Sequence, residues 1–187
     1  MELAKKILRE SLPILIIAAF GAIIAGIIVK DISIYMNILP GILILAPAIM
    51  SMTGSILGMF NSRITSAVHD GEVRVDSFKN PILKENIIAL IVIILIISIV
   101  LGILAHFFCI WLGYQSLGIL TFVMVVLLTN ALSYFFMVLI SLLVIFLSIK
   151  KKKDPDDIIF PIATVATDIG SMFFLLLIIK VIVVLLK

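Results

Sequence analysis

Long apolar runs fill most of the chain, and short polar or charged segments separate them. Each run is near or above the roughly 20 residues that a helix needs to cross a bilayer. In lipid, a helix satisfies all of its backbone hydrogen bonds internally, so such runs predict transmembrane helices rather than single strands. We therefore predict an all-α, polytopic membrane protein with five spans, at about 12–29, 38–60, 86–112, 117–149 and 158–186.

The composition supports the same class. Hydrophobic residues make up 64% of the 187 residues and charged residues 13%, whereas soluble domains are about 45–50% apolar and about 25% charged. The apolar run at 12–29 is longer than the core of a signal peptide, so we interpret it as a retained helix. We expect one membrane domain over residues 1–187, multi-pass in the cell membrane, with no cytoplasmic regulatory domain.

The distribution of basic residues predicts the orientation. With the N-terminus in the cytoplasm, eleven Lys and Arg residues fall in interior segments and two, Lys30 and Lys187, fall outside. Cytoplasmic segments of membrane proteins carry this excess of positive charge. We therefore expect a cytoplasmic N-terminus and an external C-terminus. The interior residues are Lys5, Lys6, Arg9, Arg63, Arg74, Lys79, Lys84 and Lys150, Lys151, Lys152 and Lys153.

One carboxylate, Asp168, lies inside the last apolar run. An ionised side chain is costly in hydrocarbon, so it marks a functional site by default. Thr164, Asp168 and Ser171 are spaced to share one helix face, and this stripe of oxygen atoms suits a hydrated cation. The structural alternative pairs Asp168 with Asn130, or with Lys180 of a partner, because Lys180 of the same helix is about 18 Å away.

The second apolar run is rich in helix-weakening and hydroxyl residues. Freed backbone groups in such a span need protein or a water-lined cavity, and interrupted spans are typical of transport sites. Ser51 and Ser55, at i and i+4, either line the path of the ion or bond to the preceding turn. Asn130 is either a ligand or an interhelical hydrogen-bonding residue. The unusual residues of the second run are Pro40, Gly41, Pro47, Ser51, Thr53, Gly54, Ser55 and Gly58.

The available ligand types favour Mg²⁺. Hydroxyl, amide, carboxylate and carbonyl oxygens are hard donors, and Mg²⁺ is often held through its own waters by few carboxylates. Copper or iron would favour Cys, Met or His, and the single Cys109 excludes an internal disulfide or a paired-cysteine metal site. Co²⁺ and Mn²⁺ are not separated from Mg²⁺ by these residues. Two facing copies would bring together two carboxylates, and dimers are the commonest oligomers.

Two motifs resemble the MgtE-type magnesium transporters and their eukaryotic solute-carrier relatives. They are DPDDIIFPIATVATDIGS, from Asp154 to Ser171, and PAIMSMTGSILGMFNSRITSAVHDG, from Pro47 to Gly71. The resemblance covers all of the predicted spans. It implies a homodimer whose ion path runs along the subunit interface, lined mainly by the second and fifth helices.

The resemblance also implies roles for individual residues. Asp168 corresponds to the family's pore aspartate, Thr164 and Thr167 to its hydroxyl neighbours, and Gly54 and Gly58 to its small-residue turn. The chain departs from the family where a Gly-Asn pair becomes Gly54-Ser55, which removes an amide from the expected pore lining and bears on ion selectivity. It also carries one repeat, whereas the eukaryotic relatives carry two.

These observations lead to one leading hypothesis and one alternative. The leading hypothesis is a transporter or channel for a divalent cation, with metal contacts from Asp168, Thr164, Thr167, Ser171, Ser51, Ser55, Gly54 and Asn130. The alternative is a non-transporting membrane subunit, or a half-transporter that needs a paralogous partner. No nucleophile–base pair, phosphate loop or nucleic-acid-binding surface is visible, so we expect no enzymatic activity and no organic cofactor.

Overall fold

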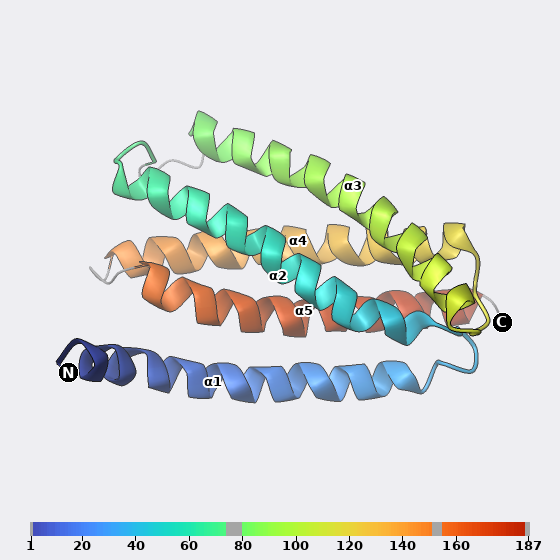
Figure 1. The fold of residues 1–187 in the computed structure, drawn as a ribbon. Helices are drawn as coiled ribbons and strands as arrows, with labels where there is room; N and C mark the ends of the chain where they lie inside the picture. The colour runs from blue at the N-terminus through green and yellow to red at the C-terminus, as the bar shows by residue number, and fades with distance from the viewer. Residues whose placement is uncertain (1, 74–79, 151–154, 186–187) are drawn as a thin grey trace.

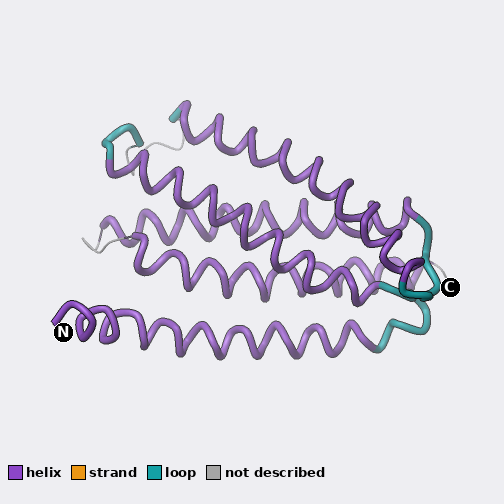
Figure 2. The backbone as a smooth tube through the Cα atoms, in the orientation of Figure 1, coloured by secondary structure: helices purple, strands orange, loops and turns teal. Residues whose placement is uncertain are grey.

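The computed structural model describes residues 2–73, 80–150 and 155–185. In this part of the chain all regular structure is helical, and each of the five helices contains a stretch long and apolar enough to cross a membrane (Figures 1 and 2). The predicted all-α, membrane-spanning architecture is therefore confirmed. The helices are α1 (Glu2–Ser33), α2 (Ile42–His69), α3 (Pro81–Trp111), α4 (Ile119–Lys150) and α5 (Pro155–Leu185).

The bundle is built around α5. This helix packs against α1, α2 and α4, while α3 packs mainly against α4 and less extensively against α2. The start of α1 and the end of α5 lie at opposite ends of the bundle (Figure 1). Because α5 is central, the packing of α1, α2 and α4 determines which of its few polar side chains are buried.

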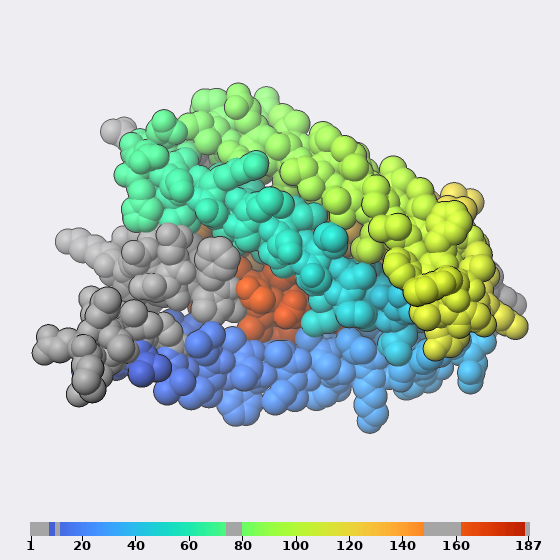
Figure 3. Space-filling view, in the orientation of Figure 1, coloured from blue at the N-terminus to red at the C-terminus, as the bar shows by residue number. Residues whose placement is uncertain are grey.

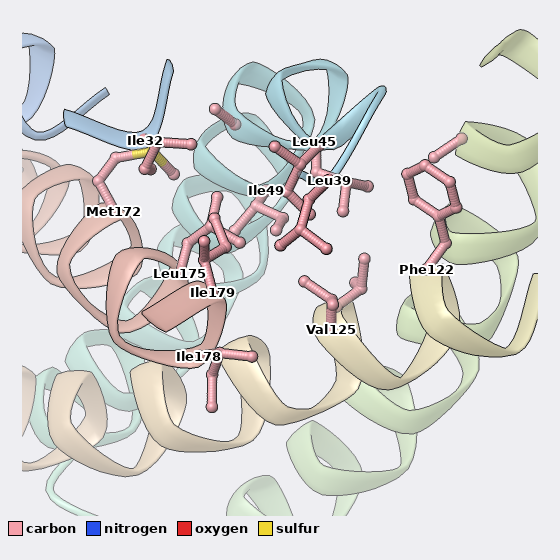
Figure 4. Packing of buried hydrophobic residues seen from close by; sticks show 14 of the residues in the cluster. Ile32, Leu39, Leu45, Ile49, Phe122, Val125, Met172, Leu175, Ile178 and Ile179 are labelled. Carbon is pink, nitrogen blue, oxygen red and sulfur yellow. The ribbon is translucent and has the colours of Figure 1, made fainter. Parts of the chain in front are cut away.

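Two apolar clusters hold the helices together. The first lies around the α1–α2 turn, where Ile32, Leu45, Phe122 and Leu175 meet from α1, α2, α4 and α5 (Figure 4). The second joins the other half of α2 to α3, α4 and α5, and Ile64 is fully buried within it. Between these clusters α2 and α5 are held side by side over much of their length.

Small residues allow helices to approach closely. A Cβ atom added at Gly102 of α3 would lie 2.5 Å from the Cα of Val123 on α4. A Cβ atom added at Gly21 of α1 would overlap the side chain of Val165 on α5. Glycine at such contacts lets two backbones pack directly on each other, which is how helices associate where lipid removes most of the hydrophobic driving force.

Several helix boundaries differ from those predicted: α1 runs from Glu2 to Ser33 instead of 12–29, and α2 begins at Ile42 instead of 38. The second helix continues past residue 60 to His69, because the intervening residues contain neither Gly nor Pro and pack into the second cluster. It ends where Gly71 takes a left-handed φ of 74° and its amide donates to the Val68 carbonyl. The third helix begins at Pro81, five residues before the predicted start, because the Asn80 side chain accepts from the Ile82 amide.

The Gly102 contact predicts a sharp sensitivity to a single methyl group. Gly102→Ala should lower the free energy of unfolding by about 1–3 kcal/mol, because the methyl would overlap the α4 backbone. Gly26→Ala in α1 is the matched control, since a Cβ there meets nothing within 4 Å and alanine favours a helix. Unfolding of the purified protein in detergent measures both. Equal stability of the two variants would contradict the close α3–α4 contact.

Candidate functional site: a groove between α2 and α5

A groove of about 540 Å³ runs along the surface between α2 and α5. Helix α2 contributes Pro47, Met50, Ser51, Gly54 and Ser55, and α5 contributes Thr164 and Asp168. The α2 residues recur at helical spacing and the two α5 residues are one turn apart, so each helix presents a single face to the groove. In the space-filling view, α5 is visible between α1 and α2 (Figure 3).

The space beside α2 depends on Pro47 and Gly54. Proline has no amide hydrogen, so it cannot donate to the carbonyl of Leu43 one turn earlier. A Cβ added at Gly54 would meet nothing within 4 Å, so a missing side chain leaves this part of the groove open. The absent side chain of Gly54 thus gives the site room.

Asp168 supplies the negative charge of the groove. Its side chain is half-buried on α5. Among the described residues, no Lys or Arg forms an ion pair with this carboxylate and no side chain donates a hydrogen bond to it; the Ser171 hydroxyl donates to the backbone carbonyl of Asp168 instead. Lys180, on the same helix, is exposed. Within residues 2–73, 80–150 and 155–185, the groove therefore carries a carboxylate with no compensating positive charge.

Serine hydroxyls line the wall opposite Asp168. Ser51 and Ser55 are both exposed in the groove. The Ser55 hydroxyl donates to the Ser51 carbonyl at 2.8 Å, which is the bond to the preceding turn that the sequence left open for this residue. Because its hydrogen is used within the helix, the oxygen lone pairs of Ser55 remain available to a donor or a cation.

The structure brings together Asp168, Thr164, Ser51, Ser55 and Gly54, and it places the other predicted site residues elsewhere. Thr167 is buried and donates to the Ala163 carbonyl. Ser171 is fully buried and donates to the Asp168 carbonyl at 3.2 Å. At the depth of Ser171, Met172 and Leu175 pack into the first cluster with α2 residues, which closes the groove.

Asn130 lies apart from the groove, between α3 and α4. It is 1% exposed, and its Nδ2 donates to the Ser98 hydroxyl at 2.9 Å. The sequence left two roles open for Asn130, a metal ligand or an interhelical hydrogen-bonding residue, and this contact corresponds to the second. Pro47 and Met50, in contrast, line the groove without having been predicted as site residues. A proline inside an apolar span is a sequence feature that could have identified Pro47 as a site residue. Met50 follows Pro47 within one helical turn.

The site is poorly suited to a fully dehydrated metal ion. No group of three or more His, Cys, Asp or Glu side chains occurs among the residues that the structure describes. One carboxylate with hydroxyl and carbonyl oxygens instead suits a cation that keeps most of its waters, as Mg²⁺ does.

The comparisons with known proteins agree with this chemistry. A family model, MgtE, described as a divalent cation transporter, matches residues 46–178. The match runs from the first turns of α2 into α5 and includes nearly all of the groove-forming parts of both helices. No curated protein and no solved structure matches the chain.

The contrasting environments of two buried serines predict different stabilities for their alanine variants. Ser98→Ala removes the acceptor of the Asn130 bond and should destabilise the protein by about 0.5–2 kcal/mol. Ser141→Ala should be neutral or stabilising, because the Ser141 hydroxyl is buried without a hydrogen-bond partner in the described structure. Unfolding in detergent measures both variants. A larger loss for Ser141→Ala would contradict these assignments.

Proposed function

The chain belongs to the MgtE family of divalent cation transporters, as its two motifs predicted, and from this premise we propose that it carries hydrated Mg²⁺ along the α2–α5 groove. The uncompensated carboxylate of Asp168 is the observation that carries the proposal. It lies among hydroxyl oxygens, in a groove of about 540 Å³. Asp168 attracts and holds the cation, and Thr164, Ser51 and Ser55 bind its hydration shell.

A second copy of the chain completes this path. In a membrane, an isolated protomer would expose Ser51, Ser55 and Asp168 to hydrocarbon, which is unfavourable for polar and charged groups. Two grooves facing each other across a two-fold axis would cover these residues and place two carboxylates around one ion. Charge neutralisation of a divalent cation by two carboxylates supports a homodimer over a lone protomer.

The basic residues of the connecting segments support an orientation with the N-terminus in the cytoplasm. In that orientation the α1–α2 turn, where the first apolar cluster closes the groove, faces the outside, and the His69 end of α2 lies in the cytoplasm. A membrane potential that is negative inside then drives cations inward, at about 2.3 kcal/mol per charge for 100 mV. Passive, channel-like flow needs no second coupling ion.

Asp168 provides the first test. Asp168→Asn and Asp168→Ala should reduce Mg²⁺ flux into proteoliposomes by about tenfold or more, since a hydrogen bond to a charged group contributes about 1.5–3 kcal/mol. Asp31→Asn, at the exposed end of α1, removes a carboxylate outside the groove and should leave flux unchanged. Equal flux in wild type and both Asp168 variants would remove this residue from the ion path. No flux through folded wild-type protein would favour a half-transporter that needs a partner.

Gly54 provides an independent test of the groove itself. Gly54→Leu should fold, because nothing lies within 4 Å of the added Cβ, and its side chain should fill part of the groove and block most of the flux. Gly26→Leu places the same side chain on an equally open surface of α1 and should conduct normally. Normal flux through Gly54→Leu would place the ion path away from this groove.

A further inference from the structure

A small second cavity adjoins the groove. It has a volume of about 20 Å³ and lies between α2 and α5. Gly54 and Thr164 line both spaces, whereas Asn61 and Thr167 line only the small cavity. The cavity therefore begins where the groove meets α5 and extends toward the His69 end of α2.

Asn61 is an unusual residue to find in this position. Its side chain is 2% exposed, and its Oδ1 has no hydrogen-bond partner within the described structure. A buried amide oxygen without a donor is destabilising, and native proteins supply such groups with a partner, often an ordered water. An unsatisfied acceptor that lines a cavity therefore points to a ligand in that cavity.

The size of the cavity selects the ligand. One water molecule needs a volume of about 10–15 Å³ and two to four polar partners, and the cavity meets both conditions. A hydrated Mg²⁺ ion is too large, because it gives up its waters reluctantly. The Thr167 hydroxyl donates to the Ala163 carbonyl, so its oxygen can act as a second acceptor beside Asn61.

We propose that this cavity binds one water molecule, held by Asn61 and Thr167, which hydrogen-bonds to the hydration shell of the cation in the groove. The water donates its two hydrogens to Asn61 Oδ1 and Thr167 Oγ1. Its lone pairs then accept a hydrogen from a water bound to the cation. Waters bound to a metal ion point their hydrogens outward. A series of hydrogen-bonded waters that ends on two acceptors therefore has the direction that a cation requires.

Asn61 is thus a positioning residue that acts on the ion through water. The presence of the water follows from the cavity and the buried amide alone. Its contact with a hydrated cation rests on the proposed function. These two parts are tested separately, by the reactivity of introduced thiols and by the effect of Mg²⁺ on that reactivity.

Thiol labelling by Ag⁺ tests whether the cavity is wet. In a Cys109→Ala background, Asn61→Cys and the control Ile64→Cys are each exposed to Ag⁺ in chloride-free buffer. The thiols that remain are counted with a maleimide after denaturation. Ile64 is fully buried in the second apolar cluster, so it reacts only through local opening of the helix packing. We expect Asn61→Cys to react at least about tenfold faster, and equal rates would overturn the water site.

Added Mg²⁺ tests the link to the groove, with Ser51→Cys as the groove position. Mg²⁺ should slow the labelling of both Ser51→Cys and Asn61→Cys, and Asp168→Asn should abolish this protection. Protection of Ser51→Cys alone would overturn the contact between the water and the ion. Protection of neither position would contradict the proposed function, while fast labelling of Asn61→Cys would still support a bound water.

Mg²⁺ flux in two Asn61 variants separates this role from a structural one. Asn61→Leu should weaken the apparent affinity for Mg²⁺ by about fivefold, the equivalent of one lost hydrogen bond, with little change in maximal flux. Asn61→Asp keeps the acceptor oxygen and should retain or raise the affinity. Unchanged affinity in Asn61→Leu, or equal losses in both variants, would overturn the proposed role.

Discussion

A carboxylate inside a membrane-spanning helix has to be compensated, and the arrangement of this bundle follows from that requirement. The described part of the protomer supplies no basic partner for Asp168. Instead it places the residue at the edge of an open groove, with Ser51, Ser55 and Thr164 nearby. Water and a cation can reach such a position. Water and a cation in the groove, and a second copy of the chain over it, would therefore offset the unfavourable free energy of an unpaired charge in lipid.

The groove exists because α2 and α5 pack closely on one part of their length and not on another. Toward the α1–α2 turn, Leu45 and Leu175 belong to one apolar cluster, and there Ser171 is covered completely. Further along α2, Pro47 and Gly54 leave space instead of filling it. On α5, Ser171 is therefore buried while Asp168 lines the groove, although the two residues are less than one turn apart.

Much of this arrangement could be predicted from the sequence, because apolar runs identify helices in lipid and helical periodicity groups Thr164 with Asp168 and Ser51 with Ser55. Periodicity cannot show which neighbour covers a given face, so it grouped Ser171 with the groove residues although Ser171 is completely buried. Nor could it reveal that Asn61 is buried beside a cavity, since the predicted loop began at that residue. The helix continues there because packing, rather than charge, decides where α2 ends.

The most direct test of the central claim is a structure of the protein in lipid nanodiscs with Mn²⁺, a divalent ion that scatters more strongly than Mg²⁺. The account predicts two copies joined so that their α2–α5 grooves face each other, with one ion between the two Asp168 side chains at a water-mediated distance. Copies joined through another face, with lipid filling the grooves and no ion near Asp168, would contradict it.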